Sequence, residues 1–108
     1  MSSAYQPPIY SEFGCDPEMA PLVEMFVEEI PSRIEVLCKA MEARDMDLLI
    51  RTAHQMKGAV GSYGFDRLTP YASAVESAVR ARKPESDIEE AVQELAGVCS
   101  LVRSGTPA

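Results

Sequence analysis

The sequence lacks the features on which several common functions depend. No apolar run approaches the roughly 20 residues of a membrane-spanning helix, and residues 1–14 have neither the basic start nor the apolar stretch of a signal peptide. Lys and Arg are scattered and the net charge is −7, whereas proteins that bind nucleic acid or anionic membranes need a basic face. We therefore expect a cytoplasmic protein that binds neither nucleic acid nor membrane.

Residues for metal sites and disulfides are also scarce. Cys15, Cys38 and Cys99 are widely spaced and form no C-x-x-C pair, which predicts reduced thiols, without a disulfide framework or zinc site. His54 is the only histidine, and no carboxylate cluster lies within a helical turn of it along the sequence, so we expect no metal and no cofactor.

The sequence also lacks the residues of a nucleophilic catalytic site and of a phosphate-binding loop. A Ser-His-Asp triad or a Cys-His dyad would have to use His54, and no residue beside it on the expected exposed face supplies a nucleophile. The glycines lie within and after a predicted helix, whereas a phosphate-binding glycine loop precedes one.

The apolar residues that are present follow a helical period. With 108 residues, of which 46% are hydrophobic, the chain can build one core. Four amphipathic segments with short connections predict an all-α fold, an antiparallel four-helix bundle over residues 16–105. Residues 1–15 are predicted to form an extended arm or a short helical turn, packed through Ile9, Tyr10 and Phe13.

The first predicted helix begins with Asp16 as N-cap and Pro17 in the first helical position. Its apolar stripe crosses Pro31, which favours one long helix bent at the proline over two helices that meet there. The stripe comprises Leu22, Phe26, Ile30, Ile34, Leu37 and Met41.

Capping signals divide the rest of the chain. Asp45 can cap a second helix that ends near Gly64, where a left-handed conformation is wanted. A third helix buries Leu68, Ala72, Val75 and Val79. The run Ser86-Asp87-Ile88-Glu89 has the form of a capping box for a fourth helix, whose stripe is Ile88, Val92, Leu95, Cys99 and Val102.

His54 is predicted to point away from the core. The buried stripe of its helix is Leu49, Ala53, Met56, Val60 and Tyr63. At about 100° per residue, His54 lies roughly 160° from Met56 and faces solvent. Its neighbours on that face are Ile50, Arg51, Lys57, Gly58 and Gly61. A glycine inside a helix costs roughly 0.5–1 kcal/mol, and close approach by another molecule would explain two of them here.

The string A-H-x-x-K-G-A-x-G-S-x-G, from Ala53 to Gly64, resembles the signature of histidine-containing phosphotransfer (HPt) domains of multistep phosphorelays. A looser resemblance includes residues 26–33, Asp45 and residues 65–68, and it covers most of residues 18–103.

The resemblance implies roles for residues of this surface. His54 would be the phosphorylated residue, Lys57 a cation beside the phosphate and Gly58 a position kept small for the partner. From the helical projection, and not from the resemblance, we expect Ile50, Arg51 and Gly61 to join Gly58 in docking, since an apolar side chain exposed at Ile50 is better explained by docking than by folding. Imidazole in general is largely neutral near pH 7, so we expect Nε2 to attack without a neighbouring base.

The resemblance also implies partners. These are the receiver domains of response regulators and a hybrid sensor kinase, and the receiver would supply an acidic pocket, Mg²⁺ and its own lysine. The protein would be a monomeric, stoichiometric phosphoryl carrier and not a turnover enzyme.

Two alternatives stay open. A helical adaptor could keep the docking face and act by binding receiver domains without phosphorylation, although the intact His54 and Lys57 count against it. The chain could also correspond to the phosphoacceptor module of a larger kinase, but 108 residues leave no room for an ATP-binding part.

Overall fold

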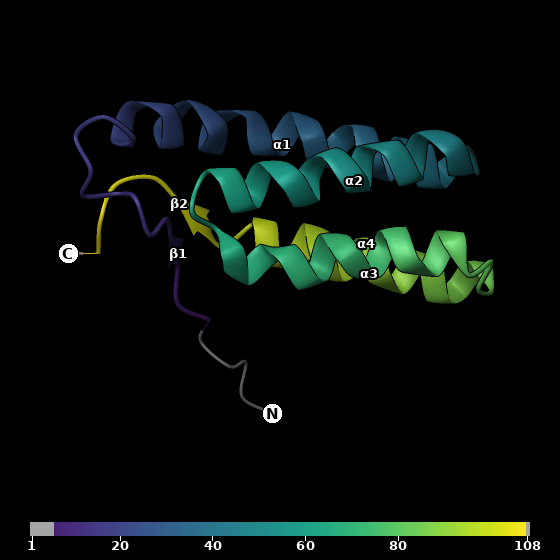
Figure 1. Ribbon diagram of the computed structural model, residues 1–108. Coiled ribbons are helices and arrows are strands. Elements are labelled where there is room, and N and C mark those ends of the chain that lie inside the picture. Colours follow the sequence, from purple (N-terminus) through teal and green to yellow (C-terminus); the bar gives the residue numbers. More distant parts are fainter. Residues whose placement is uncertain (1–5, 108) are drawn as a thin grey trace.

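The computed structural model describes residues 6–107, which form a bundle of four helices. The elements in chain order are α1 (Ala20–Glu42), α2 (Met46–Ser62), the 3₁₀ turn η1 (Asp66–Leu68), α3 (Thr69–Arg80) and α4 (Glu85–Cys99). In Figure 1, α1 and α2 lie above α3 and α4, and successive helices run in opposite directions. The fold is the all-α helical bundle that the apolar periodicity predicts. Among the described helices, none is long and apolar enough to cross a membrane.

The core consists of the apolar stripes of the four helices. Its largest fully buried side chains include Phe26, Leu37, Leu49, Met56, Leu68 and Leu95. The ring of Phe26 stacks on that of Tyr63, with 4.6 Å between their centroids. Because Tyr63 directly follows α2, this contact ties the end of that helix to α1.

The beginning of α1 differs from the prediction. The helix begins at Ala20 and not beside Asp16, because Asp16 forms a separate turn. Its backbone carbonyl accepts bonds from the N–H groups of Met19 and Ala20, and its carboxylate accepts one from Glu18. Leu22, expected in the core, is exposed, and its neighbour Val23 is buried in its place.

The proline within α1 does not divide the helix. Pro31 is exposed, and α1 is one continuous helix from Ala20 to Glu42. Ile30 and Leu37 are buried on either side of the proline. Burial of one stripe along the whole helix therefore outweighs the backbone hydrogen bond that proline removes. The prediction of one long helix is confirmed, and the bend at the proline stays a prediction.

The start of α4 also differs from the prediction. Pro84 is the N-cap, its carbonyl accepts bonds from Asp87 and Ile88, and no side chain caps the helix. Ser86 already lies within the helix, so the predicted capping box does not form.

The helix then ends at Cys99, which is buried as expected. Val102, predicted to extend α4, lies instead in the short strand β2 (Val102–Arg103).

The strand β2 joins the two ends of the described chain, a pairing absent from the prediction. It pairs in parallel with β1 (Ile9–Tyr10), and Ile9 lies opposite Val102. Both side chains are buried. Of the other predicted arm contacts, Tyr10 is half-buried and Phe13 is exposed. The part of the arm before Gln6 lies outside the described residues, and the domain boundary near residue 15 stays a prediction.

Candidate functional site

The site lies on the exposed face of α2. Asp45 caps this helix as predicted, because its carboxylate accepts a hydrogen bond of 3.1 Å from the backbone N–H of Leu48. Leu49, Ala53, Met56 and Val60 are buried on the opposite face. With that face held in the core, the side chain of His54 is 64% exposed, which confirms its predicted direction.

The end of α2 is shaped by a glycine. Gly64 has a φ of +84°, in the left-handed region that the helix end requires. A Cβ at this position would meet Ser11 Oγ and the ring of Phe13. The N-terminal arm is also bonded here, because the Ser11 hydroxyl donates to the carbonyl of Tyr63. These contacts fix where the helix that carries His54 stops.

A buried carboxylate from α3 organises the residues around His54. The side chain of Glu76 is only 9% exposed. Its Oε2 lies 3.0 Å from Nδ1 of His54, and its Oε1 lies 3.0 Å from Nζ of Lys57. Arg80, one turn further along α3, contacts Oε2 through Nη2 at 3.0 Å and Nε at 3.3 Å. Two helices thus bring one carboxylate, two cations and the imidazole together.

The surroundings of Glu76 keep it ionised. Hydrogen bonds from Lys57, Arg80 and His54, with the charge of Lys57, lower the pKa of Glu76 to about 2, although burial acts in the opposite direction. An ionised carboxylate can only accept hydrogen bonds. Nδ1 of His54 must therefore carry the proton in this contact when the imidazole is neutral, and the lone pair then lies on Nε2.

Sequence reasoning missed Glu76. A search for carboxylates within a turn of His54 could not find it, because it lies 22 residues away on another helix. One signal was available: position 76 continues the four-residue spacing of Leu68 and Ala72, both buried. A carboxylate on such a stripe requires a partner, and Arg80 four residues later is one.

Lys57 is less free than the helical projection suggests. Its side chain is 35% exposed, and its ammonium pairs with Glu76. The ammonium is therefore held on the α3 side of His54, one helical turn beyond it. Its role beside a phosphate stays a prediction.

The four predicted docking residues differ in exposure. Arg51 and Gly58 are exposed, whereas Ile50 and Gly61 are half-buried. A Cβ on Gly58 would have no heavy atom within 4 Å, and one on Gly61 would lie 3.8 Å from Oδ1 of Asp66. Of these two glycines, Gly58 therefore has the more open space around an added side chain.

Ile50 is not the freely exposed apolar side chain that the projection predicted. It lines a shallow groove of about 670 Å³ together with Val79 and Ile88, where α2 passes the end of α3 and the start of α4. Arg80 lines the same groove, so the groove adjoins the side chains that surround Glu76.

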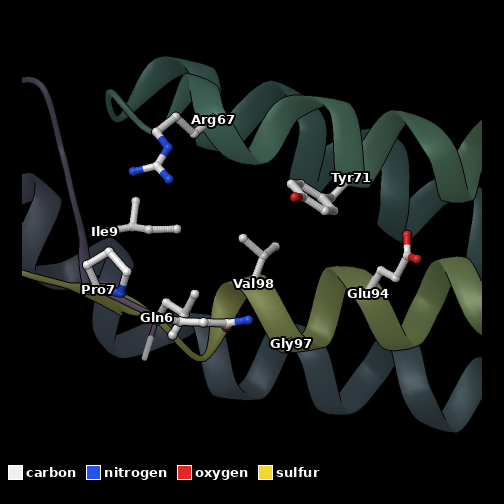
Figure 2. A pocket seen from close by; sticks show the side chains of 9 residues that line it. Gln6, Pro7, Ile9, Arg67, Tyr71, Glu94, Gly97 and Val98 are labelled. Atoms are coloured by element: carbon white, nitrogen blue, oxygen red, sulfur yellow. The ribbon is translucent and has the colours of Figure 1, made fainter. Parts of the chain in front are cut away.

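A second hollow, of about 520 Å³, lies elsewhere, between the N-terminal arm, α3 and α4. Tyr71 on α3 lies across it from Val98 on α4, with Ile9 at one end (Figure 2). His54 does not line either hollow. Because its side chain is 64% exposed, the imidazole is accessible to a molecule much larger than one that would fit a hollow. Within residues 6–107, no group of three or more His, Cys, Asp or Glu side chains could hold a metal ion.

Comparison with known families gives one result. The family model described as Hpt domain matches residues 21–105, a range that includes His54, Lys57, Glu76 and Arg80. Comparisons with curated proteins and with solved structures found no significant match. The chain belongs to the Hpt domain family, whose members are histidine phosphotransfer intermediates of two-component phosphorelays and interact with receiver domains and kinases.

Proposed function

We propose that this protein is a phosphorelay intermediate whose His54 accepts a phosphoryl group from an aspartyl phosphate of one receiver domain and passes it to another. The observation that carries the proposal is the contact of 3.0 Å between Nδ1 of His54 and the buried Glu76. This contact leaves Nε2, on the exposed side of the ring, as the nucleophile. Glu76 is here a positioning residue, since it acts through the imidazole.

The transfer itself needs no proton to leave the site. The lone pair of Nε2 attacks phosphorus in line with the aspartyl oxygen, the P–O bond breaks, and the aspartate leaves as a carboxylate with the bonding electrons. The ring, which keeps its proton on Nδ1, gains positive charge. Glu76 at 3.0 Å balances that charge. In the reverse step an aspartate oxygen attacks phosphorus, and the electrons of the N–P bond return to Nε2.

Residues on either side of His54 suit the approach of a receiver. Gly58 is exposed and has open space where a side chain would lie, so the loops of a partner could come close to Nε2. Lys57, whose ammonium lies on the α3 side of His54, would provide positive charge for the phosphoryl oxygens. We propose Arg51, Ile50 and Gly61 as further contacts in the interface.

The proposal is tested by phosphoryl transfer from a phosphorylated receiver domain. We expect an acid-labile, base-stable label on the wild-type protein and none on His54→Gln. Label that survives this substitution would contradict the proposal. A receiver that binds both proteins equally and labels neither would favour the non-phosphorylated adaptor.

Other parts of the proposal await their own measurements. We propose that Mg²⁺ comes with the receiver domain and that the protein is a stoichiometric phosphoryl carrier, not a turnover enzyme. The monomeric state and the cytoplasmic location stay predictions.

A further inference from the structure

We propose that Arg80 is a positioning residue that keeps Glu76 paired when Lys57 turns from Glu76 to a phosphoryl group on His54. This inference rests on the proposed function. It assigns different tasks to two cations that share one carboxylate in the unphosphorylated protein.

The two cations bind different oxygens of Glu76. Lys57 lies 3.0 Å from Oε1. Arg80 contacts Oε2 through two nitrogens, at 3.0 and 3.3 Å. Oε2 is also the oxygen that faces Nδ1 of His54. Arg80 therefore holds the oxygen that orients the imidazole, and Lys57 holds the other one.

The positions of Lys57 and Arg80 in the fold also suit these different tasks. Lys57 lies on α2, three residues after His54, so rotation of its side chain can carry the ammonium toward Nε2 without movement of the backbone. Arg80 lies on α3, four residues after Glu76, so its contact stays within one helix. Movement of Lys57 leaves the contact between Arg80 and Glu76 intact.

Phosphorylation makes a second cation necessary. A phosphoryl group brings about 1.5 to 2 negative charges close to Glu76, a carboxylate whose side chain is 9% exposed. If Lys57 were the only partner of Glu76, it could not neutralise both anions. With Arg80 on Oε2, Lys57 can move to the phosphoryl oxygens, and Glu76 stays ionised against the proton on Nδ1.

A role in the stability of the fold explains the position of Arg80 less well than a role at His54. The side chain of Arg80 is itself 64% exposed, and the buried Glu76 keeps a second cation, Lys57, when Arg80 is removed. The pair between Lys39 and Glu35 on α1 has the same spacing and a cation of similar exposure, but its carboxylate is exposed where Glu76 is buried, so it controls for the loss of an exposed helical cation alone. Lys39→Ala removes the same charge as Arg80→Ala, without contact to Glu76.

The first experiment measures the imidazole tautomer of the unphosphorylated protein by ¹⁵N NMR. We expect Nδ1–H to predominate in wild type, Lys57→Ala and Arg80→Ala, because either cation alone holds Glu76. The double variant should lose this preference. A loss already present in Arg80→Ala would overturn the proposal, since Arg80 would then be required before any phosphorylation.

The second experiment measures the lifetime of phosphohistidine formed with phosphoramidate, a small donor that does not require a receiver. Arg80→Ala should shorten the lifetime by about two- to fivefold, the range for one partly exposed ion pair. Arg80→Lys should restore part of the loss, and Lys39→Ala should match wild type. Equal lifetimes for Arg80→Ala and wild type would overturn the proposal.

Failure of the proposed function gives a different result. If no receiver labels His54 but phosphoramidate does, and Arg80→Ala still shortens the lifetime, receiver transfer is wrong and the role of Arg80 stands. If receivers label His54 and Arg80→Ala has no effect on lifetime, the role of Arg80 is wrong and the proposed function stands. In either case, the tautomer measurement shows whether one cation alone keeps Glu76 bonded to Nδ1 of His54.

Discussion

Nδ1 of His54 lies 3.0 Å from Oε2 of Glu76, a contact between the exposed face of α2 and the buried side of α3. The imidazole is 64% exposed and the carboxylate 9% exposed. The exposed ring thus has its inner nitrogen bonded to a fixed group and its outer nitrogen free. The imidazole is thus open to solvent and still has a defined orientation and tautomer.

Substitution of His54 should separate chemistry from stability. His54→Gln is expected to abolish the phosphoryl label, because the chain has no other histidine. Glu76 keeps Lys57 and Arg80 as partners in this variant. The free energy of unfolding, measured with urea, should therefore change by no more than about 0.5 kcal/mol. A large loss of stability would show that the imidazole is a structural member of the cluster.

The low pKa of Glu76 predicts acid sensitivity of the fold. This pKa is about 2 in the folded protein, below the ordinary 4.5. The folded state therefore favours the ionised form. The resulting stability is present above pH 4.5 and is lost as the pH falls toward about 2.

Glu76→Gln tests this linkage. The difference in unfolding free energy between wild type and Glu76→Gln should be largest at neutral pH and shrink across that acidic range. Glu90→Gln, at an exposed position of α4, removes the same charge and is the control. A constant difference between wild type and Glu76→Gln at all pH values would contradict the linkage.

Gly58 should show opposite effects on stability and transfer. Because a Cβ there meets nothing within 4 Å, Gly58→Ala should stabilise the protein by roughly 0.4–1 kcal/mol, mainly by restricting the unfolded chain. Transfer from a receiver should slow mildly in Gly58→Ala and severely in Gly58→Leu, because the side chain occupies the space a partner needs. Thermal unfolding and transfer rates measured on the same samples test both effects.

Gly97 provides the matched control for Gly58. It also lies inside a helix, is exposed, and has nothing within 4 Å of an added Cβ. Gly97→Ala should give a similar gain in stability and leave transfer unchanged. If Gly58→Leu transfers at the wild-type rate, close approach at Gly58 is not required.

Lys57 should matter more for the phosphorylated state than for folding. Lys57→Ala is expected to slow transfer or shorten the phosphohistidine lifetime, since the phosphoryl oxygens lose their nearby cation. Lys57→Arg should recover part of the effect, incompletely because the guanidinium has a different shape. If Lys57→Ala transfers and hydrolyses at the wild-type rates, Lys57 has no role beside the phosphoryl group and is only a partner of Glu76.

Helix positions were largely predictable because their signals are local. The cap at Asp45 and the left-handed Gly64 define α2 within a few residues of sequence. The starts of α1 and α4 were harder to predict. Asp16 forms a separate turn before its helix, and Ser86 already lies inside its helix. A capping pattern in the sequence does not distinguish these arrangements from a helix cap.

The sequence by itself determined that four helices form, which face of each is buried, and that His54 points to solvent. These properties follow from a period of 3.6 residues, which relates each side chain only to its neighbours on one helix. The tertiary structure decided that Glu76 meets His54, Lys57 and Arg80, and that Ile9 pairs with Val102. Such contacts depend on how far each helix is rotated and shifted against the next. That arrangement is set by packing of the whole core, and no single segment of sequence contains it.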